Sequence, residues 1–386
     1  MFSRESKILL TVTGLTHFTV HAVMVMYPAI IILLAREFDV DLATLGWIYG
    51  LSGFMFGLGA IPAGWLESRV GGRRLLLGCQ IGMVLSCLAL YFSRSLGQLT
   101  AALFFLGLSA SIYHPAGLTL ISRSTRQISR AMGYHGVAGN LGLALGPFLA
   151  SLFAVGISWR TGYGLVALFS LALVGATAAF LPSSPSPRKE SSSGSGEVTR
   201  VRPLAVYYSI VVLVGLTFYG FATFMPAHFT ENLGGPFQDV DRIIRGGLFS
   251  TLVLLSGIGG QLAGGKLGDS FRRTLLLPLI TLAHIPLLVF FGVERGAFLV
   301  LSGVLLGIVH FSFQPVGNSL VAEFTAPASR GMGYGVSFFL SFGIGAVGSG
   351  VGGNLATSYG VGMVFPFVAG WMALAFILSL FLKRLA

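Results

Sequence analysis

The sequence predicts an all-α membrane protein with twelve transmembrane helices, from its composition, its long apolar stretches and an internal repeat. Hydrophobic residues make up 54 % of the 386 residues and charged residues only 10 %, whereas a soluble domain typically has about 25 % charged residues. A charge at the bilayer centre costs at least about 2.5–3.5 kcal/mol, so a lipid-facing surface explains the deficit. The 54 glycines fit the same class, because small residues let membrane helices approach closely.

Twelve apolar stretches are long enough to cross a bilayer, and only helices satisfy their own backbone groups over such lengths in lipid. We expect spans at about 8–34, 43–66, 74–93, 98–121, 131–156, 160–182, 205–231, 243–268, 274–292, 297–322, 331–357 and 361–382.

The basic residues predict the orientation. Of the 24 Lys and Arg residues, all but six fall in one set of alternating inter-span segments that includes both chain ends. The six in the opposite set are Arg36, Arg94, Arg160, Arg242, Arg245 and Arg295. Because basic residues accumulate in cytoplasmic loops, both termini are predicted to be cytoplasmic. The scatter over many short loops also argues against nucleic-acid binding, despite a net charge of +11.

The two halves of the chain repeat each other at an offset close to 200. The segment 113–117 (YHPAG) matches 313–317 (FQPVG), and 129–134 (SRAMGY) matches 329–334 (SRGMGY). Six spans in each half insert with the same orientation, so the repeats are parallel. We therefore predict an N-terminal half at 1–182, a Ser/Pro/Gly-rich cytoplasmic linker at 183–204 and a C-terminal half at 205–386.

The segment 64–74 (GWLESRVGGRR) resembles the motif that the major facilitator superfamily carries in the loop between spans two and three. A second copy of the motif stands at 265–273 in the other half of the chain. Ser68 stands at the acidic position of the first copy. The resemblance implies the major facilitator fold and a cytoplasmic charge latch. Its residues here would be Gly64, Glu67, Arg69, Arg73, Asp269 and Arg273, and plain cytoplasmic anchoring explains the arginines equally well.

The run 139–147 (GNLGLALGP) resembles a motif of exporting antiporters in this superfamily, which adds Gly146 and Pro147 to the conformational gate. Close helix packing with a proline kink is the alternative. Within the superfamily, segments 16–21 (THFTVH), 27–28 and 113–115 most resemble fosmidomycin-resistance-type exporters. His21 and Ala116 replace two intramembrane acids of that group.

Histidines supply the titratable chemistry inside the predicted membrane. None of the 13 acidic residues falls at mid-membrane, whereas His17, His21, His114 and His310 lie on spans that line the central cavity in the superfamily. Histidine titrates near neutrality, so His21, His114 or His310 is predicted to carry a coupling proton. Hydrogen bonding to backbone carbonyls is one alternative. Metal binding is another, since His17 and His21 share a helix face and His114 could join them. We expect His135 and His284 to be structural.

Neutral polar residues on the same path are candidates for binding the solute: Tyr27, Tyr113, Asn140, Tyr219 and Gln314. Each can also bond neighbouring helices. Such a lining suits an amphipathic or weakly anionic solute better than a strong cation, which would lack a buried acid as partner.

The sequence thus predicts a secondary active transporter of a small organic solute, coupled to protons and working in export, in the bacterial inner membrane. A divalent metal-ion transporter using His17, His21 and His114, or an uncoupled facilitator, is the alternative. We expect no enzymatic activity, since the chain has no nucleotide-binding Gly-Lys-Ser/Thr loop and no nucleophile elbow. We also expect no cofactor, a monomer in the lipid bilayer, and the solute and protons as its partners.

Overall fold

The computed structural model describes residues 2–124, 128–181, 199–234, 239–326 and 329–385, without the side chains at 68, 122–124, 128–130, 330 and 331. Within these ranges, twelve helical segments are long and apolar enough to cross a membrane, which confirms the predicted span count. Most of the predicted linker, 183–198, lies outside the described residues.

Helices α1 to α8 build the N-terminal half. Their bounds are Arg4–Ala29 (α1), Ile31–Phe38 (α2), Leu42–Val70 (α3), Gly72–Phe92 (α4), Leu96–Ser111 (α5), Tyr113–Ser124 (α6), Ile128–Gly156 (α7) and Trp159–Phe180 (α8). Polar caps begin several of them. Asp41, for example, accepts a hydrogen bond from the backbone N–H of Thr44 at 2.8 Å at the start of α3.

Helices α9 to α15 build the C-terminal half. Their bounds are Val201–Asn232 (α9), Arg242–Ser270 (α10), Arg273–Val293 (α11), Gly296–Phe324 (α12), Arg330–Phe338 (α13), Val347–Tyr359 (α14) and Val364–Leu385 (α15). The π-helical segment η2, Phe339–Ile344, lies within the eleventh span between α13 and α14, and the short 3₁₀ helix η3, Val361–Met363, leads into α15.

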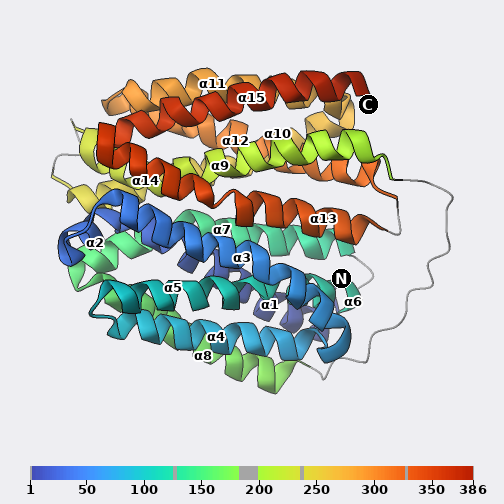
Figure 1. Cartoon of the computed structure of the whole chain (residues 1–386). Helices are drawn as coiled ribbons and strands as arrows, with labels where there is room; N and C mark the ends of the chain where they lie inside the picture. The colour runs from blue at the N-terminus through green and yellow to red at the C-terminus, as the bar shows by residue number, and fades with distance from the viewer. Residues whose placement is uncertain (1, 125–127, 182–198, 235–238, 327–328, 386) are drawn as a thin grey trace.

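The two halves pack their helices in the same pattern. In the N-terminal half α1 packs on α7, α3 on α5, and α4 on α8; in the C-terminal half α9 packs on α14, α10 on α12, and α11 on α15. Figure 1 shows the halves as two layers of helices, with both chain termini at one end. We call this end the terminal end and the other the opposite end. The matching pairs agree with the predicted parallel repeat.

The halves touch each other through α3 with α14 and η2, and through α7 with α10. The N–H of Ala43 donates to Oγ1 of Thr357 at 3.0 Å, near the opposite end. On the second pair of helices, the hydroxyl of Thr251 donates to the carbonyl oxygen of Ala144 at 2.6 Å. A Cβ added at Gly57 would overlap the backbone of η2, so the two halves are in backbone contact there.

Towards the terminal end, the same helix faces no longer meet. A Cβ added at Gly64 on α3, Gly136 on α7, Gly265 on α10 or Gly335 on α13 would have no neighbouring atom within 4 Å. These glycines continue, at helical spacing, the faces that carry the contacts described above. The halves are therefore closed against each other at the opposite end and apart at the terminal end.

The first span, predicted at about 8–34, begins and ends earlier, at Arg4 and Ala29. Helix α1 ends at Ala29, directly after Pro28, and the chain continues as the separate helix α2 at the opposite end. Glu37 on α2 accepts hydrogen bonds from the guanidinium of Arg160 at 2.5 Å and from the indole N–H of Trp159 at 2.6 Å. Partial burial acts to raise the pKa of Glu37, but these bonds outweigh it, so the pKa lies below its ordinary value.

This carboxylate should contribute stability that depends on pH. A group whose pKa is lowered by folding stabilises the fold fully above its ordinary pKa, and this contribution is lost as the pH falls from there through the lower pKa of the folded state. Between about pH 5 and pH 3, the apparent melting temperature of the wild-type protein should therefore fall further than that of Glu37→Gln. Differential scanning fluorimetry in detergent measures both curves. Exposed Glu5 provides the control variant Glu5→Gln, which should follow the wild type. Parallel curves for Glu37→Gln and the wild type would contradict the prediction.

Candidate functional site

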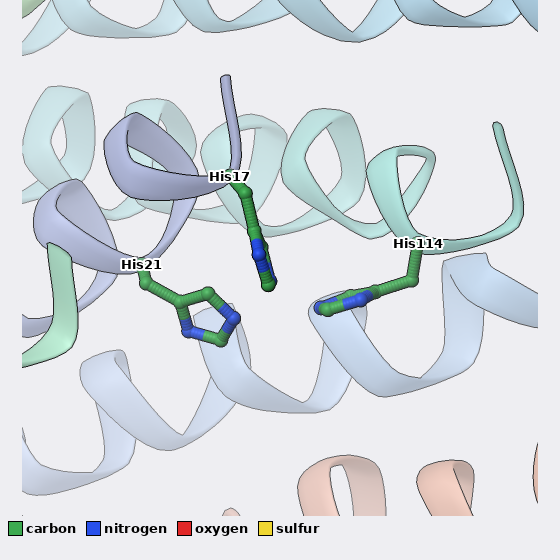
Figure 2. A group of neighbouring side chains, drawn as sticks. All are labelled: His17, His21 and His114. Carbon is green, nitrogen blue, oxygen red and sulfur yellow. The ribbon is translucent and has the colours of Figure 1, made fainter. Parts of the chain in front are cut away.

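Three of the predicted histidines gather in the N-terminal half. His17 and His21 lie one turn apart on α1, and His114 lies near the start of α6 (Figure 2). One ring nitrogen from each lies within 4.8 Å of the others. The ring centroids are 4.7 Å apart for His17 and His21, 5.2 Å for His17 and His114, and 5.5 Å for His21 and His114. The sequence predicted this grouping, because His17 and His21 are four residues apart on one helix and His114 was expected to join them.

The ring of His17 has a defined orientation. Its Nδ1 lies 2.9 Å from the carbonyl oxygen of His135 on α7, and because a carbonyl only accepts, Nδ1 carries the proton. Nε2 of His17 is then left with its lone pair, and it is buried without a hydrogen-bond partner among the described residues. A Cβ at Gly139 would overlap this ring, so the glycine provides the space in which the ring lies.

His135 belongs to the same cluster, although the sequence suggested a structural role. Its ring stacks on that of His17, with centroids 4.0 Å apart and planes 7° apart. Its Nδ1 lies 3.3 Å from the hydroxyl of Tyr113. The available sequence signal was its position four residues before Gly139, because the glycines at 139, 142 and 146 mark the face of α7 that packs on α1.

A break in the fourth span positions His114. Helix α5 ends at Ser111 and α6 begins at Tyr113, where Pro115 lacks the N–H that would continue the α-helical bonding. The ring of His114 is half-buried and lies 5.0 Å from the ring of Phe338 on α13. His114 is thus the member of the cluster that contacts the other half.

The predicted polar residues Asn140 and Gln314 are joined through Gln261, which the sequence did not single out. Nδ2 of Asn140 donates to Gln261 at 2.7 Å, and Nε2 of Gln261 donates to Gln314 at 2.9 Å. Asn140 comes from the N-terminal half and the two glutamines from the C-terminal half. The three amides therefore form a polar bridge between the halves.

The three predicted tyrosines are buried. Tyr27 is 1 % exposed and donates to the carbonyl oxygen of Leu45 at 3.1 Å. Tyr113 is 0 % exposed and donates to the carbonyl oxygen of Thr13 at 2.5 Å. These two hydroxyls bond neighbouring helices in this conformation. Tyr219 on α9 reaches α3, where a Cβ at Gly53 would lie 2.8 Å from its hydroxyl.

His310 forms a second, smaller imidazole site in the C-terminal half. Its Nδ1 lies 3.4 Å from Nε2 of His284, and Nδ1 of His284 lies 2.8 Å from the carbonyl oxygen of Ile280. The carbonyl fixes the proton of His284 on Nδ1, so His310 donates to its Nε2. Phe218 stacks on His310 at 4.8 Å. This pair does not join the N-terminal cluster.

The arginines of the predicted latch hold helices of their own halves in this conformation. Arg73 donates to the carbonyl oxygen of Ala178 on α8 at 2.8 Å. Arg273 pairs with Glu323 on α12 at 3.4 Å, while the Asp269 side chain is exposed. Since the halves are apart at this end, a latch between them remains a prediction.

The other predicted gate residues differ in their surroundings. Gly64 faces open space, the Arg69 guanidinium lies 3.7 Å above the ring of Trp65, and Glu67 is buried. Gly146 packs against α1, where an added Cβ would lie 2.6 Å from the carbonyl oxygen of Ala22. Pro147 is buried next to α10. The packing interpretation of the 139–147 run therefore has direct structural support.

The middle of the bundle offers neutral groups rather than acids. Among the described residues, every carboxylate lies in α2, between helices or within the last turn or first turn of a helix. Glu190 and Glu197 lie outside the described residues. The chemistry available between the halves is thus hydrogen bonding by amides, aromatic contact and the lone pairs or protons of imidazoles.

Comparison with known proteins agrees with this architecture. The family model of the Major Facilitator Superfamily matches residues 11–240 and 207–385. The chain is 25 % identical over 351 residues to the uncharacterized MFS-type transporter YfnC of Bacillus subtilis, covering 88 % of this chain and 84 % of YfnC.

More distant relatives carry substrate names. A probable sugar efflux transporter of Mannheimia succiniciproducens is 22 % identical, with 72 % of this chain and 67 % of that protein covered. The probable nitrate transporter NarT of Staphylococcus epidermidis is 23 % identical, with 62 % and 60 % covered.

A solved structure extends the comparison to the whole fold. The nucleoside transporter NupG superposes with a TM-score of 0.82 at 14 % identity, covering 98 % of this chain and 99 % of NupG. At that identity the likeness concerns the fold. With a family model that matches nearly the whole length and twelve membrane-spanning helices in two repeated halves, the chain belongs to the major facilitator superfamily and is a membrane transporter rather than an enzyme.

Proposed function

We propose that this transporter moves a small organic solute, amphipathic or weakly anionic, by alternating access and exports it in exchange for protons. The observation that supports it most is the set of neutral groups between the halves: imidazoles, amides and aromatic rings, without a carboxylate at the same depth among the described residues. A strongly cationic solute would find no buried counter-charge there, and desolvating an unpaired charge is costly.

The arrangement of the halves supports alternating access. They are closed at the opposite end and apart at the terminal end, where Gly64 and Gly335 face open space. If the charge asymmetry places that end in the cytoplasm of the bacterial cell, the described conformation faces inward. The N-terminal half, 1–182, would then rock against the C-terminal half, 205–386, around the bridge of Asn140, Gln261 and Gln314.

For the coupling proton, His310 is the candidate that the geometry favours over His21 and His114. In the neutral pair His310 donates from Nδ1 to His284, which leaves its Nε2 as the atom that can take up a proton. The half-buried His310 ring is accessible to a proton while His284 holds it in place. The N-terminal cluster then remains for the solute.

Two sequence features support the direction and the solute class. The 139–147 run resembles the motif of exporting antiporters, and the Mannheimia succiniciproducens relative is named a probable sugar efflux transporter. The probable nitrate transporter among the relatives is named for an anionic substrate. A metal-ion transporter without an organic solute and an uncoupled facilitator are the competing possibilities.

The test has two stages. A thermal-shift panel of sugars, nucleosides, organic acids and phosphonates on the purified protein should identify a stabilising solute, because a ligand of the folded state raises apparent stability. Proteoliposomes loaded with a pH-sensitive dye should then show proton movement opposite to the solute. His310→Gln should uncouple the two, while His228→Gln, whose wild-type ring bonds to the carbonyl of Phe291 at 2.8 Å, should not.

Each stage can overturn a part of the proposal. Solute flux that neither moves protons nor responds to a pH gradient would make the protein an uncoupled facilitator. Coupled flux that persists at the wild-type ratio in His310→Gln would exclude His310 as the proton carrier. Stabilisation by sugars, nucleosides or cations alone would exclude the weakly anionic solute class.

A further inference from the structure

We propose that His17, His21 and His114 together bind one divalent transition-metal ion, and that an anionic organic solute completes its coordination. The inference rests on the proposed function in one respect, because the fourth ligand is the solute that passes between the halves. It gives that solute a chemical class: a small anion with carboxylate or phosphonate oxygens that binds as a metal complex.

The first argument is the number and spacing of the donor atoms. Three imidazole nitrogens lie within 4.8 Å of one another. Around a tetrahedral zinc ion, with Zn–N bonds of about 2.0–2.1 Å, ligand nitrogens are about 3.3 Å apart. Figure 2 shows the three rings turned towards a common space. Binding would require the half-buried rings of His21 and His114 to turn until the three nitrogens reach that spacing.

The second argument is that His17 is already oriented as a ligand. Histidines that bind metals generally donate their other ring N–H to a carbonyl or carboxylate, which fixes the tautomer and the direction of the free nitrogen. His17 does this through Nδ1 and the carbonyl of His135, at 2.9 Å. Nε2 of His17 and Nε2 of His114 are both buried without a hydrogen-bond partner among the described residues. Nε2 of His135, whose ring stacks on that of His17, is a third such atom. Buried nitrogens usually have a partner, so the free nitrogens on the neighbouring rings of His17 and His114 point to a ligand.

The third argument is charge. The cluster contains imidazoles alone, with no carboxylate or thiolate among its members. Neutral imidazoles leave a divalent ion with its full charge in a site that is largely removed from water, and such a charge needs a counter-ion. Three protein ligands also leave one tetrahedral position open. An anionic oxygen donor in that position supplies both the missing ligand and the missing charge.

The position of the cluster links the metal to the transport cycle. His114 contacts Phe338 of the C-terminal half with ring centroids 5.0 Å apart. The metal site is built by one half, and one of its three ligands contacts the other half. A change in the arrangement of the halves would therefore act on the site through His114.

The experiment uses the full-length purified protein, stripped with a chelator and freed of any polyhistidine tag. Titration with CoCl2 should give the visible absorption of tetrahedral cobalt at one ion per chain, and calorimetry with ZnCl2 should give the same stoichiometry. His17→Ala, His21→Ala and His114→Ala should each weaken binding by more than about 10-fold, the lower limit for losing even an outer-shell partner. His228→Gln, a buried histidine in the other half, should bind as the wild type does. His21→Gln, which keeps the side-chain size, is the second variant if an alanine fails to fold.

A second arm measures thermal shifts with citrate and with methylphosphonate, each with and without ZnCl2. Stabilisation that requires both anion and metal, and that is lost in His114→Ala, is the expected result. Absence of cobalt or zinc binding overturns the metal site, while anion binding without metal would leave the proposed function standing. Metal binding that no anion alters overturns the fourth-ligand part of the inference. Binding retained in all three alanine variants would place the metal elsewhere.

Discussion

Oxidative cross-linking of the Ala43→Cys/Thr357→Cys double variant should abolish solute transport, and a reductant should restore it. The N–H of Ala43 donates to the hydroxyl of Thr357 at 3.0 Å across the closed end of the bundle, so the two introduced cysteines would stand at positions that contact each other. One belongs to α3 and the other to α14, which come from different halves. A covalent bond there keeps this end closed, and alternating access requires it to open once in every cycle.

The measurement is solute flux in proteoliposomes, before and after reduction, with each single variant as a control. The native Cys79 and Cys87 are buried and should not react. Full flux through the cross-linked protein would mean that the closed end need not separate, and would contradict the rocking of the halves proposed above.

Gly142→Ala should destabilise the protein by about 1–3 kcal/mol, the usual cost of inserting atoms into a packed interior. A Cβ at Gly142 would overlap the carbonyl oxygen of Phe18, so α1 and α7 would have to move apart. This is the contact that also holds the ring of His17 against the carbonyl of His135. The apparent melting temperature in detergent should fall by several degrees, and metal binding should weaken with it.

Gly136→Ala is the matched control on the same helix. A Cβ at Gly136 has no neighbouring atom within 4 Å, and alanine is favoured over glycine in a helix by about 0.8–1 kcal/mol. The control should therefore be as stable as the wild type or more so. If both variants shifted the melting temperature alike, close packing of α7 on α1 would not explain the glycine run.

Patterns along the chain predicted the architecture well, because hydropathy and charge act on each segment separately. The twelve spans were predicted, and the spacing of His17 and His21 anticipated their approach. The break after Pro28 was missed, since α2 is also apolar and hydropathy alone extends the span through it. Orientation and the linker boundaries remain predictions.

The site was predicted only in part, because its remaining members depend on which helix faces meet. His135 stacks on His17, and Gln261 joins Asn140 to Gln314. Neither relation has a sequence spacing that reveals it, since His17 and His135 are 118 residues apart, and Gln261 is 121 residues from Asn140 and 53 from Gln314. Conversely, a tyrosine on a cavity-lining span was a reasonable candidate for binding the solute. In this conformation, however, Tyr113 is buried and its hydroxyl donates to the backbone carbonyl of Thr13.

The π-helical turn η2 determines which side of α13 faces the N-terminal half. Its i to i+5 bond, from the N–H of Gly345 to the carbonyl of Leu340, adds one residue to a turn. Each residue turns an α-helix by about 100°. The side chains of α13 therefore point in directions that an uninterrupted α-helix through the eleventh span would not give. Phe338 meets His114 from that offset face. Rewinding this one turn as α-helix would rotate Phe338 about the helix axis and away from His114.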